Sequence, residues 1–141
     1  MTDVRLRVAA LIERDGRLLV AKERARGQSG RHDGEFYLTP PGGGIEMGES
    51  PVTAVIREVR EETGLVVTRA EYVSQIEHPG AMTTLYRTWV EPGEPILGID
   101  PEDTCDCPRL VGLEWIDAPL MSVWTGPEAR SALSIPHPGA R

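Results

Sequence analysis

Three glutamates, Glu58, Glu61 and Glu62, follow one another at spacings of three and four residues. In a helix these positions are neighbours, roughly 5–6 Å apart at Cβ, so their charges repel one another. The repulsion is worse at the C-terminus of a helix, where the macrodipole favours cations. A solvated charged face is the usual explanation. The alternative is a divalent cation, because Mg²⁺ and Mn²⁺ bind carboxylate oxygens, and a metal held there points to phosphate chemistry.

The residues around these glutamates predict a helix with defined ends. Ser50 is a favourable N-cap, Pro51 suits the first helical position, and Gly64 supplies the left-handed residue that ends a helix. No glycine or proline interrupts residues 52–63. Apolar residues at spacings of three and four predict one buried face: Val52, Val55, Ile56 and Val59.

A glycine-rich loop precedes this helix. Pro40 and Pro41 are followed by three glycines, Gly42 to Gly44. Because glycine has no side chain, the backbone N–H and C=O groups of such a loop can approach a ligand or metal closely. A plain strand-to-helix turn is the alternative. A Walker phosphate loop is excluded, since no Gly-Lys-Ser/Thr follows the glycines.

The pattern between residues 43 and 65 resembles the Nudix box, the signature of the Nudix (MutT-like) hydrolase family. Every fixed position of that box is filled: Gly43, Glu49, Arg57, Glu58, Val59, Glu61, Glu62, Gly64 and Leu65. Similarity to this family implies an α/β fold, an αβα sandwich around a mixed β-sheet. It also implies that residues 1–141 form a single Nudix hydrolase domain.

The resemblance implies a role for each polar residue of the box. The implied ligands of the catalytic divalent cations are carboxylates of the helix and a carbonyl of the glycine loop: Glu58, Glu61, Glu62 and Gly42 or Gly43. Glu49 is implied to hold Arg57 and so to orient the metal-binding turn. Neither of these two residues would touch the metal, and both would position its ligands.

The catalytic base is expected among the same carboxylates, because clustered carboxylates raise one another's proton affinity until a metal binds. In the family, the base is either a glutamate of the box or one further downstream. We expect Glu61 or Glu114 in this role, with Glu58 as a further catalytic residue. Glu114 also has a plain interpretation as an exposed strand residue, and Glu102 and Asp103 are rival downstream acids.

The activity implied by the resemblance is divalent-metal-dependent hydrolysis of the diphosphate linkage in a nucleoside diphosphate derivative. Water attacks one phosphorus, and cations that bridge the phosphoryl oxygens stabilise the developing charge. The substrate stays open between the ADP-ribose or nucleotide-sugar type and (d)NTPs. Pro79, 15 residues beyond Gly64, is a feature of members that act on ADP-ribose, although His-Pro-Gly also suffices as a turn. The alternative function is a non-catalytic Nudix-like module that senses a nucleotide.

Basic and aromatic residues outside the box are candidates for binding the substrate. Lys22, Arg24 and Arg26 leave the second predicted strand where family members often hold the diphosphate, and arginine matches phosphate oxygens bidentately. Tyr37 and Tyr86 are expected to stack on a base or sugar. A solvated basic loop and aromatic core residues are the respective alternatives.

The composition fits a small acidic protein. With 141 residues and a formal charge of −7, the chain suits one core and argues against a broad nucleic-acid surface. No run of 18 apolar residues predicts a membrane span, and the first residues lack the apolar stretch of a signal peptide. We therefore expect a cytoplasmic protein with a small nucleotide-type partner. A homodimer is compatible with the sequence, which does not determine the oligomeric state.

Alternation of apolar and polar residues predicts the strands that position the box. They are expected at residues 4–13, Leu18–Glu23, Phe36–Thr39, Leu65–Glu77, Met82–Val90 and Leu110–Ile116, with a hairpin turn at Asp15-Gly16. The acidic, proline-rich loop 91–109 is long enough to be a lid, a specificity element or a disordered segment. Residues 127–133 are expected to add one or two helical turns, and residues 135–141 a loose tail.

Two cysteines, Cys105 and Cys107, lie in that loop. Too few ligands surround them for a zinc site. A disulfide across one residue would be strained, and none is expected in a cytoplasmic chain, so two free thiols are predicted.

Overall fold

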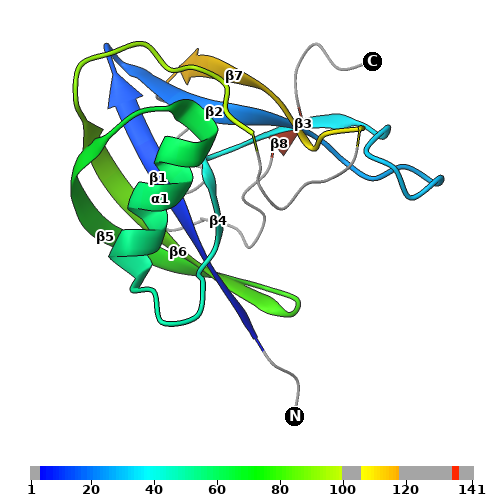
Figure 1. Cartoon of the computed structure of the whole chain (residues 1–141), viewed down its shortest axis with the longest axis horizontal. Coiled ribbons are helices and arrows are strands. Elements are labelled where there is room, and N and C mark those ends of the chain that lie inside the picture. Colours follow the sequence, from blue (N-terminus) through cyan, green and yellow to red (C-terminus); the bar gives the residue numbers. More distant parts are fainter. Residues whose placement is uncertain (1–3, 100–105, 118–134, 137–141) are drawn as a thin grey trace.

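The computed structural model describes residues 4–99, 106–117 and 135–136. Within them the chain forms one helix and a mixed β-sheet (Figure 1), which confirms the predicted α/β class. The elements in chain order are β1 Arg5–Arg14, β2 Arg17–Arg24, β3 Phe36–Thr39, β4 Gly42–Gly44, α1 Pro51–Thr63, β5 Val67–His78, β6 Ala81–Val90, β7 Leu110–Asp117 and β8 Ile135–Pro136. The helical turns predicted at residues 127–133, which would supply a second helical layer, lie outside the described residues.

Strands β1 and β2 are paired over only part of their length. Its strand order is β5-β6-β1-β2-β3-β8, with β4 pairing to β1 and β7 to β2 off this path. β1 runs parallel to β6 over residues 5–12 and pairs with β2 at residues 12–14. The first half of β1 pairs instead with β4, with Arg7 opposite Gly44. β1 and β2 therefore diverge, and the space between them is enclosed by β3 and β4.

The glycine loop predicted before the helix is in fact the short strand β4. A Cβ atom at Gly42 would overlap the carbonyl oxygen of Val8 and lie 2.8 Å from the Cα atom of Ala9. Only a residue without a side chain lets the two backbones come this close. The glycines thus serve strand pairing as well as access to the backbone.

Helix α1 begins and ends where predicted, but its buried face is turned from the predicted one. The Ser50 side chain accepts a hydrogen bond from the N–H of Thr53 at 3.1 Å, and Gly64 is left-handed with φ of 73°. Val52 and Ile56, predicted to be buried, are 43% and 38% exposed. The buried residues are Ala54, Val55, Val59, Glu62 and Thr63. The helix packs on β1, β4 and β5 (Figure 1). The carboxylate of Glu58 lies beside Gly43 as a result.

Apolar clusters cover both faces of the sheet. Val8 and Ala10 pack with the helix, whereas their strand neighbours Ala9 and Leu11 belong to the other cluster, since successive strand residues point to opposite faces. The cluster under α1 comprises Val8, Ala10, Ile12, Leu19, Ala54, Val55, Val59, Leu65, Val67 and Tyr86. The opposite cluster comprises Ala9, Leu11, Leu18, Val20, Leu38, Ile76 and Leu85.

The described part of the acidic loop, residues 91–99, lies across the C-terminal end of α1. The N–H of Ile96 donates to the carbonyl of Thr63 at 2.8 Å, and the N–H of Gly98 donates to the carbonyl of Glu62 at 2.9 Å. These bonds satisfy two carbonyls that a helix end leaves unpaired. This segment is therefore ordered against the turn that carries the glutamates.

Cys107 is disulfide-bonded, so the prediction of a free thiol is wrong at this residue. Cysteines two positions apart can lie within the Cα separation that a disulfide needs, so their spacing alone does not exclude the bond. Cys105 lies outside the described residues. Among the residues that are described, no helix is long and apolar enough to cross a membrane.

Candidate metal and phosphate site

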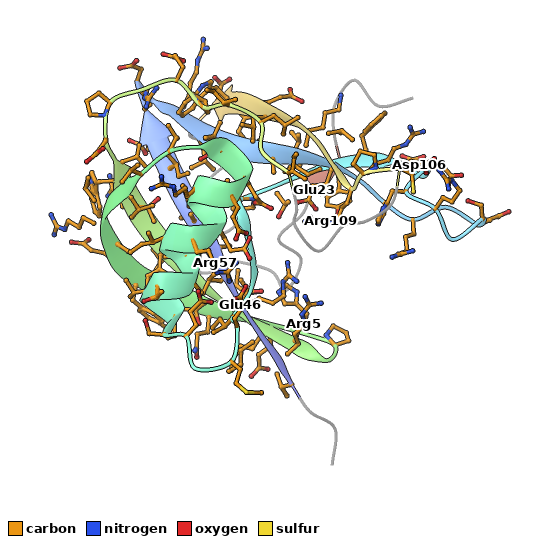
Figure 2. The ribbon with its side chains drawn as sticks, viewed as in Figure 1. Arg5, Glu23, Glu46, Arg57, Asp106 and Arg109 are labelled. Atoms are coloured by element: carbon orange, nitrogen blue, oxygen red, sulfur yellow. The ribbon has the colours of Figure 1, made fainter. Side chains whose placement is uncertain are left out.

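A cavity of about 370 Å³ occupies the opening between β1 and β2, a size within the usual range for small-molecule sites. Figure 2 shows Glu23 and Arg109 together near β2 and β3, Arg57 on α1, and Glu46 and Arg5 lower in the view. The lining residues are Arg5, Arg7, Glu23, Tyr37, Gly42, Gly43, Gly44, Glu46, Arg57, Glu58, Glu61 and Arg109. The lining is almost entirely polar and charged, which suits an ionic ligand.

Two of the three glutamates of α1, Glu58 and Glu61, form one wall of this cavity with Gly43. A Cβ atom at Gly43 would lie 2.5 Å from Oε1 of Glu58, so the missing side chain leaves room for that carboxylate. The structure thus brings together Glu58, Glu61 and a backbone position of β4, as the resemblance implies.

Glu62 lies behind this wall and is 2% exposed. Its Oε1 accepts a hydrogen bond from the N–H of Gly42 at 3.0 Å, and its Oε2 lies 3.7 Å from Nη2 of Arg109. Burial, together with the charges of Glu23 and Glu58, raises the pKa of Glu62 to about 8. A buried carboxylate next to other carboxylates binds either a proton or a cation.

Arg57 ties the wall together. Its Nε and Nη2 donate to the two oxygens of Glu49 at 2.8 and 2.9 Å, the bidentate geometry that arginine and carboxylate favour. Nη2 also donates to the carbonyl of Gly44 at 3.0 Å. Nη1 donates to Glu58 at 2.9 Å and lies 3.3 Å from an oxygen of Glu61. The predicted pairing of Glu49 with Arg57 is therefore present, and it fixes where the other two carboxylates lie.

The Glu49–Arg57 pair predicts a stability loss in acid. The hydrogen bonds from Arg57 lower the pKa of Glu49 from 4.5 to about 2. A carboxylate whose pKa is lowered on folding stabilises the fold fully above its unfolded pKa of 4.5. This stabilisation is lost as the pH falls toward 2. We expect urea unfolding to show wild type more stable than Glu49→Gln at pH 7, with the difference shrinking between pH 4.5 and pH 2. A difference that is the same at pH 7 and pH 2.5 would contradict the pairing.

The oxygen donors of the wall suit a hard divalent cation such as Mg²⁺ or Mn²⁺. Within the described ranges, no three His, Cys, Asp or Glu side chains already converge on one point as ligands. Arg57 lies among the carboxylates instead and balances their charge. The donor chemistry of the wall fits a cation.

Adjacent glycines in β4 are expected to respond differently to alanine. Gly42→Ala places a methyl group against the backbone of Val8 and Ala9, which cannot move without separating β4 from β1. We expect it to cost about 3 kcal/mol or more of unfolding free energy. In Gly43→Ala the three atoms nearest the new methyl group all belong to the Glu58 carboxylate, which is the end of a side chain and can shift. The variant should therefore weaken Mn²⁺ binding about tenfold and leave stability within about 1 kcal/mol. Urea unfolding and calorimetric Mn²⁺ titration of both variants test this, and equal stability losses would contradict it.

Five residues of the cavity were not predicted from the sequence: Arg5, Arg7, Glu23, Glu46 and Arg109. Glu23 is 4% exposed, accepts a hydrogen bond from the hydroxyl of Tyr37 at 2.6 Å and pairs with Arg109. The sequence pattern could have predicted that Glu23 is buried, because Leu19, Ala21 and Glu23 are alternate residues of one strand and share a face. An inward-pointing acid in a strand needs a partner, and here Arg109 and Tyr37 supply it.

Glu114, one of two predicted bases, does not reach the cavity. Its neighbours Leu113 and Trp115 pack against the cluster under α1, so Glu114 points to the opposite face of the sheet. It lies opposite Val20, which belongs to the other apolar cluster. The structure thus places Glu114 away from the carboxylates of the wall, and its role as a base stays a prediction. Among the predicted bases, the structure places Glu61 at the cavity wall.

The five predicted substrate-binding residues all lie in the described part of the chain, and Tyr37 is the one that lines the cavity. Lys22 and Arg24 flank the ring of Phe36 instead, 4.5 and 4.8 Å from its centre. They alternate with Glu23 along β2 and therefore point away from it.

The other two residues predicted to bind substrate, Arg26 and Tyr86, are not among those that line the cavity. Arg26 donates to the carbonyl of Gly30 at 2.6 Å within its own loop. Tyr86 is 8% exposed and belongs to the core under α1, which is the alternative interpretation of a strand aromatic.

Comparison with known proteins agrees with the geometry. Residues 3–128 match the NUDIX domain family. The chain is 46% identical over 68 residues to the CTP pyrophosphohydrolase of Escherichia coli (strain K12), covering 48% of this chain and 46% of that protein. It is 41% identical over 59 residues to the ADP-ribose pyrophosphatase of Methanocaldococcus jannaschii, covering 42% and 31%. The crystal structure of a MutT NUDIX hydrolase from Burkholderia pseudomallei superposes with a TM-score of 0.63 at 27% identity, covering 82% of this chain and 84% of that one.

The chain belongs to the NUDIX family, since the family match covers most of its length. The match to each of the two named enzymes spans less than half of that enzyme's length. The family and the fold are therefore established by these similarities, and the substrate is a separate question.

Proposed function

We propose that this protein hydrolyses the diphosphate linkage of a nucleoside diphosphate derivative with the help of Mg²⁺ or Mn²⁺. The observation that carries the proposal is the wall formed by Glu58, Glu61 and Gly43, with Arg57 holding both carboxylates in place. An intact box on a cavity of ligand size favours catalysis over nucleotide sensing. The relatives named above, which carry the words CTP and ADP-ribose in their names, support a small nucleotide-type substrate.

In this proposal each residue has a defined task. Glu58, Glu61 and Glu62, with a carbonyl of Gly42 or Gly43, would hold the cation, which supplies positive charge to the phosphoryl oxygens. Arg57 and Glu49 keep these ligands oriented. Glu61, whose side chain is 28% exposed at the wall, is the residue placed to accept a proton from water.

The test is a substrate panel with Mg²⁺, Mn²⁺ and EDTA in parallel. It contains CTP and other canonical and oxidised (d)NTPs, ADP-ribose, nucleotide sugars, dinucleoside polyphosphates and NADH, with products resolved by chromatography. Metal-dependent turnover of one class supports the proposal. Tight nucleotide binding without turnover at saturating metal would overturn it in favour of a sensor.

A further inference from the structure

Two arginines of β1, Arg5 and Arg7, line the cavity together with Arg109. Two positions apart on one strand, they point to the same side and lie about 7 Å apart along it. Arg7 is paired in register with Gly44, and Arg5 lies against the same glycine, with its Nη2 3.3 Å from the place where a Cβ atom would be. Since Gly44 carries no side chain, both guanidiniums can line the cavity beside the wall of Glu58, Glu61 and Gly43.

These two arginines differ in their partners from the other arginines of the cavity. Arg57 and Arg109 each contact two or more carboxylates. Among the residues that the structure describes, neither Arg5 nor Arg7 forms an ion pair with a carboxylate. Arg7 is half-buried and Arg5 is exposed. Burial and the charges of Arg5 and Arg109 lower the pKa of Arg7, whereas the charges of Glu23 and Glu58 raise it. The guanidiniums of Arg5, Arg7 and Arg109 repel one another around one cavity, and an anion bound between them would relieve that repulsion.

The positions of the carboxylates and of Arg5 and Arg7 indicate which part of a substrate the two arginines would contact. The carboxylates, and the cation they would hold, lie on the helix side of the cavity, where they suit the two phosphates that flank the bond to be cleaved. Arg5 and Arg7 face the same space from β1, beyond Gly44. A sugar in this position would offer them no negative charge. A third phosphate would offer a dianion that two guanidiniums can grip bidentately.

We propose that Arg5 and Arg7 bind the terminal phosphate of a nucleoside triphosphate, and that the preferred substrate class is therefore a triphosphate rather than a nucleoside diphosphate linked to a sugar. This inference rests on the proposed function. In the reaction, a water oxygen bonds to one phosphorus of the α–β bridge and the bridging P–O bond breaks. The water proton passes to the base, and the products are a nucleoside monophosphate and pyrophosphate.

The experiment compares CTP with ADP-ribose as probes, using wild type, Arg5→Gln, Arg7→Gln and the double variant. Arg17→Gln, which removes an exposed arginine from the β1–β2 hairpin, is the matched control. We expect the double variant to lower kcat/KM for CTP about 100-fold, mainly through KM, and to leave ADP-ribose within about threefold. Arg5→Lys and Arg7→Lys should restore part of the loss, because they keep the charge without the bidentate geometry.

Several results would overturn the inference. One is a wild type that hydrolyses ADP-ribose and no triphosphate, and another is an equal loss for both substrates in the double variant. If neither substrate is hydrolysed, the proposed function fails, and calorimetry with a non-hydrolysable CTP analogue still tests the arginines. Binding that is unchanged in the double variant would then refute their role, whereas a loss of affinity specific to the triphosphate would support it. Thermal unfolding of each variant shows whether it is folded.

Discussion

Replacing Glu61 with glutamine is expected to lower kcat by about 10³-fold in the presence of Mg²⁺ and to leave the fold intact. The substitution keeps the size of the side chain and removes one negative oxygen from the cavity wall. Glutamine is a poor ligand for a hard cation and a poor proton acceptor, so both proposed tasks of Glu61 are lost together. The loss should fall mainly on kcat, because the interactions concerned strengthen as charge develops on the phosphoryl oxygens.

The control for Glu61→Gln is Glu13→Gln, which removes an exposed carboxylate of β1 that is not among the residues lining the cavity. It should retain full activity. Urea unfolding must show that Glu61→Gln is as stable as wild type, and Mn²⁺ titration separates metal loss from loss of the base. A variant that keeps kcat within threefold of wild type would refute the role of Glu61 in either task.

Much of this site could be predicted because its signals are local in the sequence. Ser50, Pro51 and Gly64 define the ends of α1 through contacts within a few residues, and each behaves as expected. The Glu49–Arg57 pair lies within one loop and two helical turns. The carboxylates at spacings of three and four must share one side of the helix. Hydrogen bonding and helix geometry therefore determine this half of the cavity.

The opposite half of the cavity depends on contacts between distant segments. The register of β7 against β2 decides whether Leu113 or Glu114 faces the helix. A shift of one residue would exchange the two. Because successive residues of β2 point to opposite faces, Glu23 points into the cavity and Lys22 and Arg24 point away from it. Arg5 and Arg7 reach the cavity because β1 leaves β2 and pairs with β4, which no local pattern indicates. Sequence spacing identifies a catalytic helix better than it identifies what faces that helix.

Replacing Glu62 with glutamine is expected to stabilise the metal-free protein at high pH. The pKa of Glu62 is raised by burial from 4.5 to about 8, so the folded state holds its proton more tightly than the unfolded chain. Stability from this group is therefore lost as pH rises from 4.5, and the loss is complete above 8. The variant should exceed wild type by under about 1 kcal/mol at pH 5 and on the order of 4 kcal/mol at pH 9.

Urea unfolding in EDTA at pH 5, 7 and 9 tests this prediction, with Glu13→Gln as the control for loss of one carboxylate. A Glu62→Gln variant that is no more stable than wild type at pH 9 would contradict it. In saturating Mn²⁺ the order should reverse, because the ion binds the carboxylate and stabilises the native state of wild type alone by mass action. A residue that destabilises the metal-free fold and stabilises the metal-bound one is explained by its ligand rather than by packing.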